Sequence, residues 1–202
     1  KNLNSKFKTV VLPFSIDKAD LKKKFSTKIH RRCIFFSRLH NQKGLDKLIN
    51  AWIMVADKSW KLDVVGFGSK NYYLKKFNLR HNKNIKFLNP VTNKKKKFKL
   101  FDNYDFFVLP SISESFSLAI LESLARRVPV LTTNKTPWSD IQTNNSGWII
   151  NDSFTELKLV LYEIFNLSKK DFLIKKRNTI KVAKNYETKI VSSLYLKNYK
   201  KI

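Results

Sequence analysis

The chain has 202 residues, enough for one large domain or two small ones, and 43% of them are hydrophobic, including 16 Phe and 4 Trp. Such a chain can bury a sizeable core, which argues against disorder. Its one cysteine, Cys33, excludes an internal disulfide and fits the reducing cytoplasm, and with only three His it argues against a structural zinc site. We find no run of 18 apolar residues and no signal peptide, so we expect neither a membrane span nor secretion.

The net charge of +26 is extreme. It indicates an anionic partner, such as nucleic acid, an acidic membrane surface or a phosphorylated ligand. A compositional explanation competes with this one, because Lys, Asn, Phe and Ile all have A/T-rich codons and the chain is rich in each. A high net charge by itself predicts solubility and nonspecific binding, but it does not identify a function.

Short apolar runs alternate with helical patterns along most of the chain. The apolar runs predict a strand that ends at Pro13 and further strands at residues 33–36, 62–65, 85–88, 106–109, 128–132 and 147–150. Helices are expected at 45–57, at 69–77, from the lysines at 94–97 to Phe101, from about Ser117 and from Pro137, which suits a first helical turn. The lysine run is interpreted as a solvated helix face. The pattern of residues 18–30 indicates a surface segment or a short helix. After the last strand only helices are expected, at 154–166, 170–186 and 189–199.

This alternation predicts an α/β fold, a doubly wound parallel sheet of about six strands with helices on both faces and C-terminal helices, without an internal linker. Ligands bind such sheets at the carboxyl ends of the strands. Four loops follow strands and should therefore converge on one edge: residues 37–44, 66–68, 89–91 and 111–117.

The first of these loops carries Arg38 and Lys43, with Gly44 allowing a close backbone approach. Two fixed cations beside a helix start suit a diphosphate, because Arg offers a bidentate fork and Lys a point charge. In a chain with 41 Lys and Arg, however, any loop carries cations. Gly66 and Gly68 superficially resemble a dinucleotide loop, but the third glycine is missing and we expect a simple tight turn.

Two acids, Glu114 and Glu122, flank the helix start near Ser117. Backbone N–H groups at a helix start form an anion site, so acids beside it suit a ligand with both phosphates and hydroxyls, such as a nucleotide sugar. Alternatively, Glu122 makes a structural hydrogen bond or an ion pair with Arg126, four positions later. Spacing leaves both open, and the acids need not be a general acid/base pair.

The motifs resemble those of a known family. Residues 110–122, Pro-Ser-x-x-Glu-Ser-Phe-Ser-Leu-x-x-x-Glu, resemble the E-x7-E motif of the retaining GT-B glycosyltransferases of family 4. Residues 36–45 resemble the family's GRL…KG loop, 64–68 its VGxG turn, and 125–130 its A-x-G-x-PV segment. Residues 136–138 and 145–148 resemble TPW…N-x-GW, and 12–17 resemble the PNGID loop. The resemblance thus spans nearly the whole chain in the right order.

The resemblance implies that residues 1–202 are one Rossmann-like, nucleotide-sugar-binding domain, the C-terminal half of a GT-B fold. It implies a hexosyltransferase that uses a nucleotide-diphosphate sugar such as a UDP-sugar, retains configuration, needs no metal or other cofactor, and serves lipopolysaccharide or polysaccharide biosynthesis. The acceptor would be a glycan or a lipid-linked molecule, at the inner face of an anionic membrane. The implied catalytic residues are Glu114, which holds the donor sugar, and Arg38 and Lys43, which bind the diphosphate and steady the leaving group. The implied donor-binding residues are Arg38, Lys43, Gly44, Glu114, Ser115, Phe116, Ser117, Leu118, Glu122 for the ribose, and Pro90 and Val91 facing the base.

Three departures weaken this expectation: Ser37, Ser117 and Arg127 stand where the family has glycine. The N-terminal acceptor domain is also absent from the sequence. The chain would then be a fragment, one half of a transferase split with a partner chain, or an inactive nucleotide-sugar-binding subunit. The hypothesis that the chain binds nucleic acid rests on charge alone and is disfavoured. The sugar, base, acceptor and oligomeric state stay open.

Overall fold

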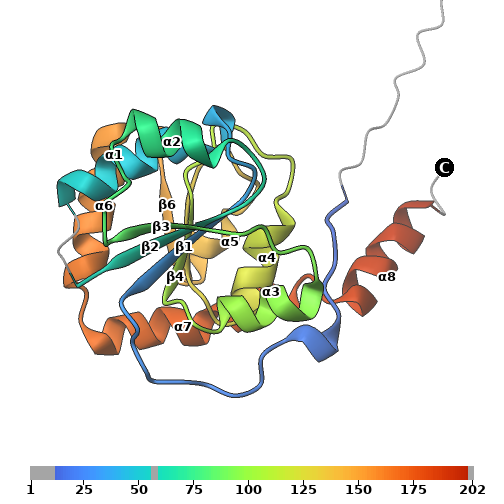
Figure 1. Ribbon diagram of the computed structural model, residues 1–202. Helices are drawn as coiled ribbons and strands as arrows, with labels where there is room; N and C mark the ends of the chain where they lie inside the picture. Colours follow the sequence, from blue (N-terminus) through green and yellow to red (C-terminus); the bar gives the residue numbers. More distant parts are fainter. Residues whose placement is uncertain (1–11, 56–58, 200–202) are drawn as a thin grey trace, which may run out of the picture.

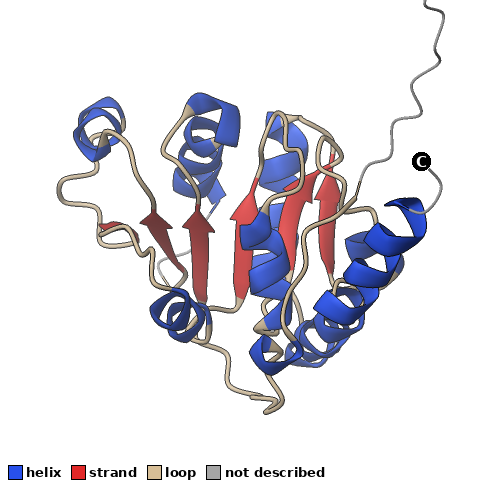
Figure 2. Ribbon diagram, turned by 90° about the vertical axis from the view of Figure 1, so that its right-hand side faces the viewer, coloured by secondary structure: helices blue, strands red, loops and turns tan. Residues whose placement is uncertain are grey.

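A six-stranded sheet forms the centre of the structure, a computed structural model that describes residues 12–55 and 59–199. All neighbouring strands pair in parallel, in the order β3-β2-β1-β4-β5-β6, and their arrows point the same way in Figure 2. The strands are β1 (Arg32–Phe36), β2 (Lys61–Val65), β3 (Ile85–Leu88), β4 (Phe106–Leu109), β5 (Val130–Thr133) and β6 (Gly147–Ile150). The predicted doubly wound parallel sheet is confirmed.

Helices cover both faces of this sheet (Figure 1). One face carries α1 (Leu45–Val55), α2 (Lys70–Lys76) and α6 (Phe154–Asn166). The other carries α3 (Lys94–Phe101), α4 (Leu118–Ala125), α5 (Asp140–Thr143) and α7 (Lys169–Lys184). Two short 3-10 turns, η1 (Lys18–Asp20) and η2 (Asn41–Lys43), lie in loops. None of the helices described is long and apolar enough to cross a membrane.

The core lies between the sheet and these helices, and among the interior strands only β4 is wholly apolar. Every residue of β4 and β5 is buried. The ring of Phe106 lies between Trp52 and Trp60, with centroids 6.4 and 5.6 Å away. Cys33 is fully buried, as predicted for a core residue, and burial raises the pKa of its thiol well above the ordinary value.

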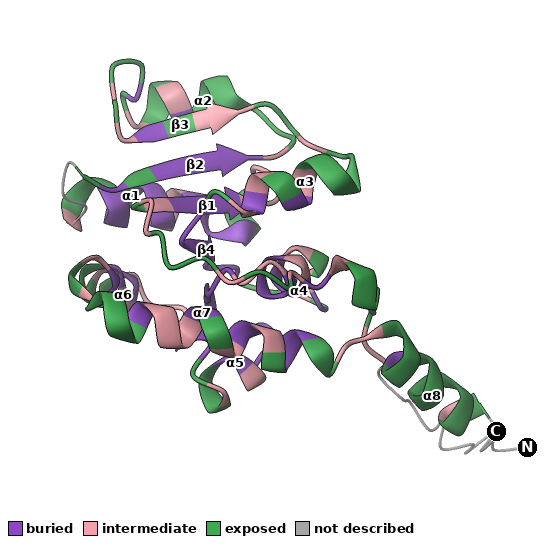
Figure 3. Cartoon of the chain, turned by 90° about the horizontal axis from the view of Figure 1, so that it is seen from below, coloured by how far each residue is buried: buried purple, intermediate pink, exposed green. Residues whose placement is uncertain are grey.

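The last helix, α8 (Thr188–Tyr199), extends past the layers and is largely exposed (Figure 3). Its start is joined to the beginning of the described chain, because the N–H of Ile16 donates to Tyr186 O at 2.9 Å and the N–H of Thr188 donates to Ile16 O at 3.0 Å. The strand predicted to end at Pro13 is wrong in its described part, where residues 12–13 have no regular structure; residues 10–11 lie outside the described part.

Two other predicted starts differ from the structure by two or three residues, and one predicted end, at residue 57, lies outside the described part. The strand expected from Val128 begins at Val130, because the N–H of Val128 donates to Ser123 O and closes the turn after α4. The helix expected at Pro137 begins only at Asp140, after a turn in which the N–H of Thr136 donates to Thr133 O. The helix expected to reach residue 57 is described up to Val55; residues 56–57 lie outside the described part.

Candidate functional site

The four predicted loops lie at the carboxyl edge of the sheet, and hydrogen bonds join three of them, at residues 37–44, 66–68 and 111–117. After β1, the N–H of Leu39 donates to Phe67 O at 2.7 Å in the loop after β2. In the loop after β4, the N–H of Ile112 donates to Gln42 O at 2.9 Å. Gly44 has φ +72°, and a Cβ added there would lie 1.9 Å from Pro110 O, so its lack of a side chain serves the contact between two loops. The edge is therefore one connected surface.

The Gly66–Gly68 turn packs against the loop after β1. A Cβ on Gly66 would lie 1.7 Å from Ser37 O, and one on Gly68 would lie 2.6 Å from the Cβ of Leu39. Both glycines have positive φ, of +158° and +141°. The structure thus gives them a role in protein packing, as expected for a tight turn.

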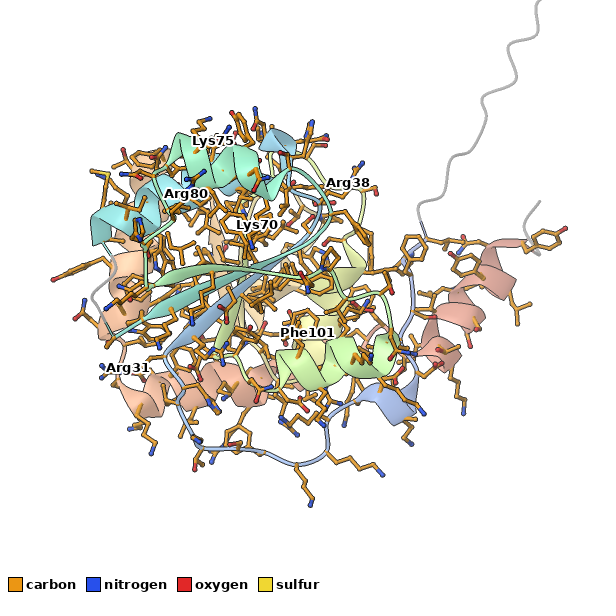
Figure 4. The ribbon with its side chains drawn as sticks, viewed as in Figure 1. Arg31, Arg38, Lys70, Lys75, Arg80 and Phe101 are labelled. Atoms are coloured by element: carbon orange, nitrogen blue, oxygen red, sulfur yellow. The ribbon has the colours of Figure 1, made fainter. Side chains whose placement is uncertain are left out.

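Lys43 and Glu114, two of the predicted catalytic residues, form an ion pair. The Lys43 Nζ lies 2.7 Å from Glu114 Oε1, and the two side chains are only 11% and 10% exposed. Each charge therefore compensates for the loss of water around the other. Arg38 is brought to the same edge but differs from them: it is exposed, and it makes no ion pair or hydrogen bond with the part of the chain that the structure describes. Figure 4 shows Arg38 on the outer surface, at the end of the molecule where Lys70 and Lys75 of α2 lie.

The loop before α4 holds Phe116 in a rigid aromatic cluster. Its ring lies 4.8 Å from that of Trp138 and 5.6 Å from that of Tyr186, and the Trp138 Nε1–H donates to Phe116 O. The backbone N–H groups of Phe116, Ser117 and Leu118 donate no hydrogen bond within residues 12–55 and 59–199. They are therefore free of protein acceptors, which the predicted role in binding an anion requires.

Glu122 is paired, but not with Arg126, the partner that one of the two open alternatives gave it. Its Oε1 lies 2.5 Å from the Nζ of Lys97 on α3, and its side chain is 13% exposed. Arg126 instead binds Asp102 with two hydrogen bonds, at 3.0 and 2.7 Å. The N–H of Arg126 still donates to Glu122 O at 3.1 Å, but its guanidinium is used by Asp102. Burial raises the pKa of Glu122, and Lys97 opposes that shift.

Lys97 is the residue of this site that sequence reasoning missed, since the whole run at 94–97 was predicted to be a solvated face. Its side chain is 17% exposed. A signal was present in the spacing: Lys97 stands four residues before Phe101, which is fully buried, so the two share a face of α3. That face packs against α4.

Two of the three glycine departures occupy conformations that favour glycine. Ser117 has φ +67° and Arg127 has φ +65°, whereas Ser37 is not among the described residues with positive φ. Ser117 caps α4 but accepts no hydrogen bond through its side chain. The family's glycine pattern therefore marks a real backbone requirement at two positions of this chain.

The other predicted residues lie around the same edge. Ser115 and Pro90 are exposed, and Val91 is half-buried against the core beside the end of β3. The structure does not assign these three residues a ligand, so their roles stay predictions. The described residues contain no group of three or more His, Cys, Asp or Glu that could hold a metal ion.

Comparison with known proteins gives relatives in the family that the motifs resemble. The sequence model of the family "Glycosyl transferases group 1" matches residues 30–162. The glycogen synthase of Mycoplasma mobile is 31% identical over 170 residues, which cover 78% of this chain and 35% of that protein. The chain spans between 26% and 37% of the length of the curated relatives it matches.

Solved structures of glycosyltransferases share the fold. A chain of the GtfA/B complex aligns with a TM-score of 0.74 at 18% identity, over 94% of this chain and 39% of that one. Anabaena HepE in complex with UDP-glucose aligns with a TM-score of 0.72 at 16% identity, over 93% of this chain and 56% of that one. These alignments confirm a Rossmann-like domain of the GT-B type. Since the family model matches well over half of the sequence, the chain belongs to the group 1 glycosyl transferases.

Proposed function

We propose that this chain is the donor-binding part of a glycosyltransferase that transfers a hexose, with retention, from a nucleotide-diphosphate sugar. The observation that carries the proposal is the arrangement at the carboxyl edge of the sheet. Two largely buried carboxylates, Glu114 and Glu122, lie on either side of the unpaired backbone N–H groups that begin α4. Lys43 is in contact with Glu114, and Arg38 is exposed beside them.

The chemistry assigned to these residues is positioning and charge stabilisation. The bond between the anomeric carbon and the diphosphate oxygen breaks, the acceptor oxygen bonds to that carbon, and the acceptor proton passes to the departing phosphate. Arg38, Lys43 and the N–H groups of the α4 start stabilise the charge on that leaving group. The ammonium of Lys43 has several N–H donors, so it can stay bonded to Glu114 and still donate to a phosphate oxygen. Glu114 accepts hydrogen bonds from the sugar hydroxyls.

The nucleotide is held by the remaining predicted residues. Glu122 accepts hydrogen bonds from the ribose hydroxyls, and Pro90 and Val91 face the base. The diphosphate site is shaped by Gly44, Ser115, Phe116, Ser117 and Leu118. No step needs a metal. HepE was solved with UDP-glucose, which supports a UDP-sugar as the first donor to test.

The acceptor side lies outside this chain in our proposal. Glycogen synthase, the name of one relative, supports a glycan acceptor, and a lipid-linked acceptor is the alternative. The GtfA/B complex supports a partner chain or domain that supplies the acceptor site. A net charge of +26 favours the cytoplasm at the inner, anionic face of a membrane.

The test is calorimetric titration with UDP- and GDP-sugars. We expect one of them to bind, and Glu122→Gln to weaken its binding about tenfold or more, because hydrogen bonds from hydroxyls to a carboxylate are charge-assisted. Glu163→Gln, at an exposed position of α6, is the charge-matched control and should bind as the unchanged chain does. If no nucleotide sugar binds, or if Glu122→Gln binds as tightly as the control, the donor-site proposal is wrong.

The second candidate is an inactive nucleotide-sugar-binding subunit. It is favoured by Ser117, which places a side chain where the backbone has φ +67° at the proposed phosphate site. Turnover with an acceptor-domain chain from the same gene neighbourhood separates the two. Donor binding without sugar transfer in any such mixture favours the inactive subunit.

A further inference from the structure

One lysine of the run at 94–97 behaves differently from the others. Lys95 and Lys96 are exposed, and the side chain of Lys94 is 53% exposed while it pairs with Asp20. The side chain of Lys97 is 17% exposed. A largely buried lysine is stable only when a carboxylate and further contacts compensate for its lost hydration.

The position of Lys97 on α3 explains its burial. It precedes Phe98, which is 7% exposed, and shares a face with the fully buried Phe101. Its Nζ lies 5.8 Å above the ring of Phe36, the last residue of β1. The ammonium is thus held between a ring of the sheet and the carboxylate of Glu122, 2.5 Å away on α4.

This contact uses only one side of the Glu122 carboxylate. Oε1 faces Lys97, and Oε2 accepts no hydrogen bond from the residues described and is not sealed from solvent. Two other charged groups influence Glu122: Lys94 on α3 and Asp20 on η1, which pair with each other. Burial raises the pKa of Glu122, whereas Lys97 contributes the largest opposing effect.

We propose that Lys97 is a positioning residue of the donor site, which holds Glu122 ionised and leaves one carboxylate oxygen free for the ribose hydroxyls. This inference rests on the proposed function. Lys97 touches Glu122 rather than the nucleotide, so it acts through the carboxylate. Its removal should weaken recognition of ribose and leave the diphosphate contacts intact.

The experiment compares a nucleoside diphosphate with its 2′-deoxy counterpart. Calorimetry measures Kd for UDP, GDP and both deoxy forms between about pH 6 and pH 8, and the ratio of deoxy to ribo Kd reports the ribose contact. Phosphate titration affects both ligands equally, so it cancels in the ratio. The variants are Lys97→Met, Lys97→Arg and the exposed control Lys96→Met.

We expect a ratio of about ten or more for the unchanged chain, for Lys97→Arg and for Lys96→Met. In Lys97→Met the carboxylate should take up its proton at a higher pH. The ratio should therefore fall below that of the unchanged chain as the pH is lowered toward about pH 6 and recover as the pH rises. Should Lys97→Met fail to fold, Lys97→Gln takes its place with the same expectation.

Two results would overturn the inference while the proposed function stands. One is a Lys97→Met ratio that matches the control at every pH. The other is equal weakening of the ribo and deoxy ligands, which would assign Lys97 to the phosphates or to folding alone. If neither UDP nor GDP binds the unchanged chain, the proposed function fails first and the inference falls with it.

Discussion

Ser117 and Arg127 hold a backbone conformation that normally favours glycine, yet they differ in what their side chains contribute. Both have φ near the left-handed region, +67° and +65°. A side chain there costs about 1–2 kcal/mol. The hydroxyl of Ser117 makes no capping hydrogen bond. The guanidinium of Arg127 donates to Lys22 O at 2.9 Å and lies 5.6 Å above the ring of Phe25, so its side chain offsets part of the strain.

This contrast gives a prediction for two glycine variants. Ser117→Gly should raise the free energy of unfolding by about 0.5 kcal/mol, since relief of strain exceeds the added freedom of the unfolded chain. Arg127→Gly should lower it by about 1 kcal/mol, because it loses a hydrogen bond and a cation–π contact. Urea unfolding of both variants measures the two changes. A gain in stability for Arg127→Gly, or a loss for Ser117→Gly, contradicts this account.

The sequence predicted the acids of the candidate site, but it could not predict their partners. Glu114 and Glu122 stand out because the chain has only 15 acidic residues, and their spacing places them on either side of a helix start. The partner of Glu122 depends on how closely α3 packs against α4, which no local pattern records. For that reason the ion pair with Arg126, one of the two alternatives that the spacing left open, is not formed, and Lys97 was overlooked.

At the level of elements, buried strands were the most predictable feature. The apolar runs at 85–88, 106–109 and 147–150 match β3, β4 and β6. Of these, only β4 is an interior strand, and it is buried at every residue, as a wholly apolar run requires. The other two are the edge strands of the sheet, and β3 includes the exposed Lys86. The errors fall at proline. Pro129 and Pro137 lie beside turns closed by short-range hydrogen bonds, from the N–H of Val128 to Ser123 O and from the N–H of Thr136 to Thr133 O. The composition around the prolines did not reveal that these turns delay the start of the next element.

The ends of α3 and α4 are joined by a cluster of charges around Asp102. Arg126 donates to both oxygens of Asp102, and the Nζ of Lys22 lies 3.0 Å from Oδ1. Arg126 also donates to Asp20 O at 3.1 Å. A bidentate pair between partly buried side chains is stronger than an ordinary surface ion pair. The cluster therefore fixes the segment around residue 20 against two helices.

A double-mutant cycle measures this contribution. Arg126→Met and Asp102→Asn should each lower the free energy of unfolding by about 1–3 kcal/mol, with a coupling of about 1 kcal/mol or more between them. Urea unfolding of the two single variants and the double variant gives the coupling. Lys23→Met, an exposed lysine of the same segment, is the control and should change stability little. Additive single effects would mean that the pair is no stronger than any surface contact.

The charge of the whole molecule is unbalanced, with 41 Lys and Arg against 15 Asp and Glu. Within residues 12–55 and 59–199 the ion pairs use most of the acids near α3 and α4, and they leave many exposed lysines without a carboxylate partner. Figure 4 illustrates this on α2, where Lys75 lies at the margin of the molecule with Arg80 near by. Like charges at this density repel one another and oppose the compact state.

The unfolding temperature should therefore rise with salt. Between about 50 and 300 mM NaCl the Debye length falls below about 10 Å, so repulsion among exposed lysines is screened while the largely buried pairs of Glu114 and Glu122 are affected less. Differential scanning calorimetry measures the slope. A variant with four exposed lysines changed to glutamine, at positions 95, 96, 170 and 181, should show a shallower slope because less repulsion remains to be screened. An unfolding temperature that falls with salt in both proteins would mean that attractive ion pairs, rather than net repulsion, dominate the electrostatic free energy of this fold.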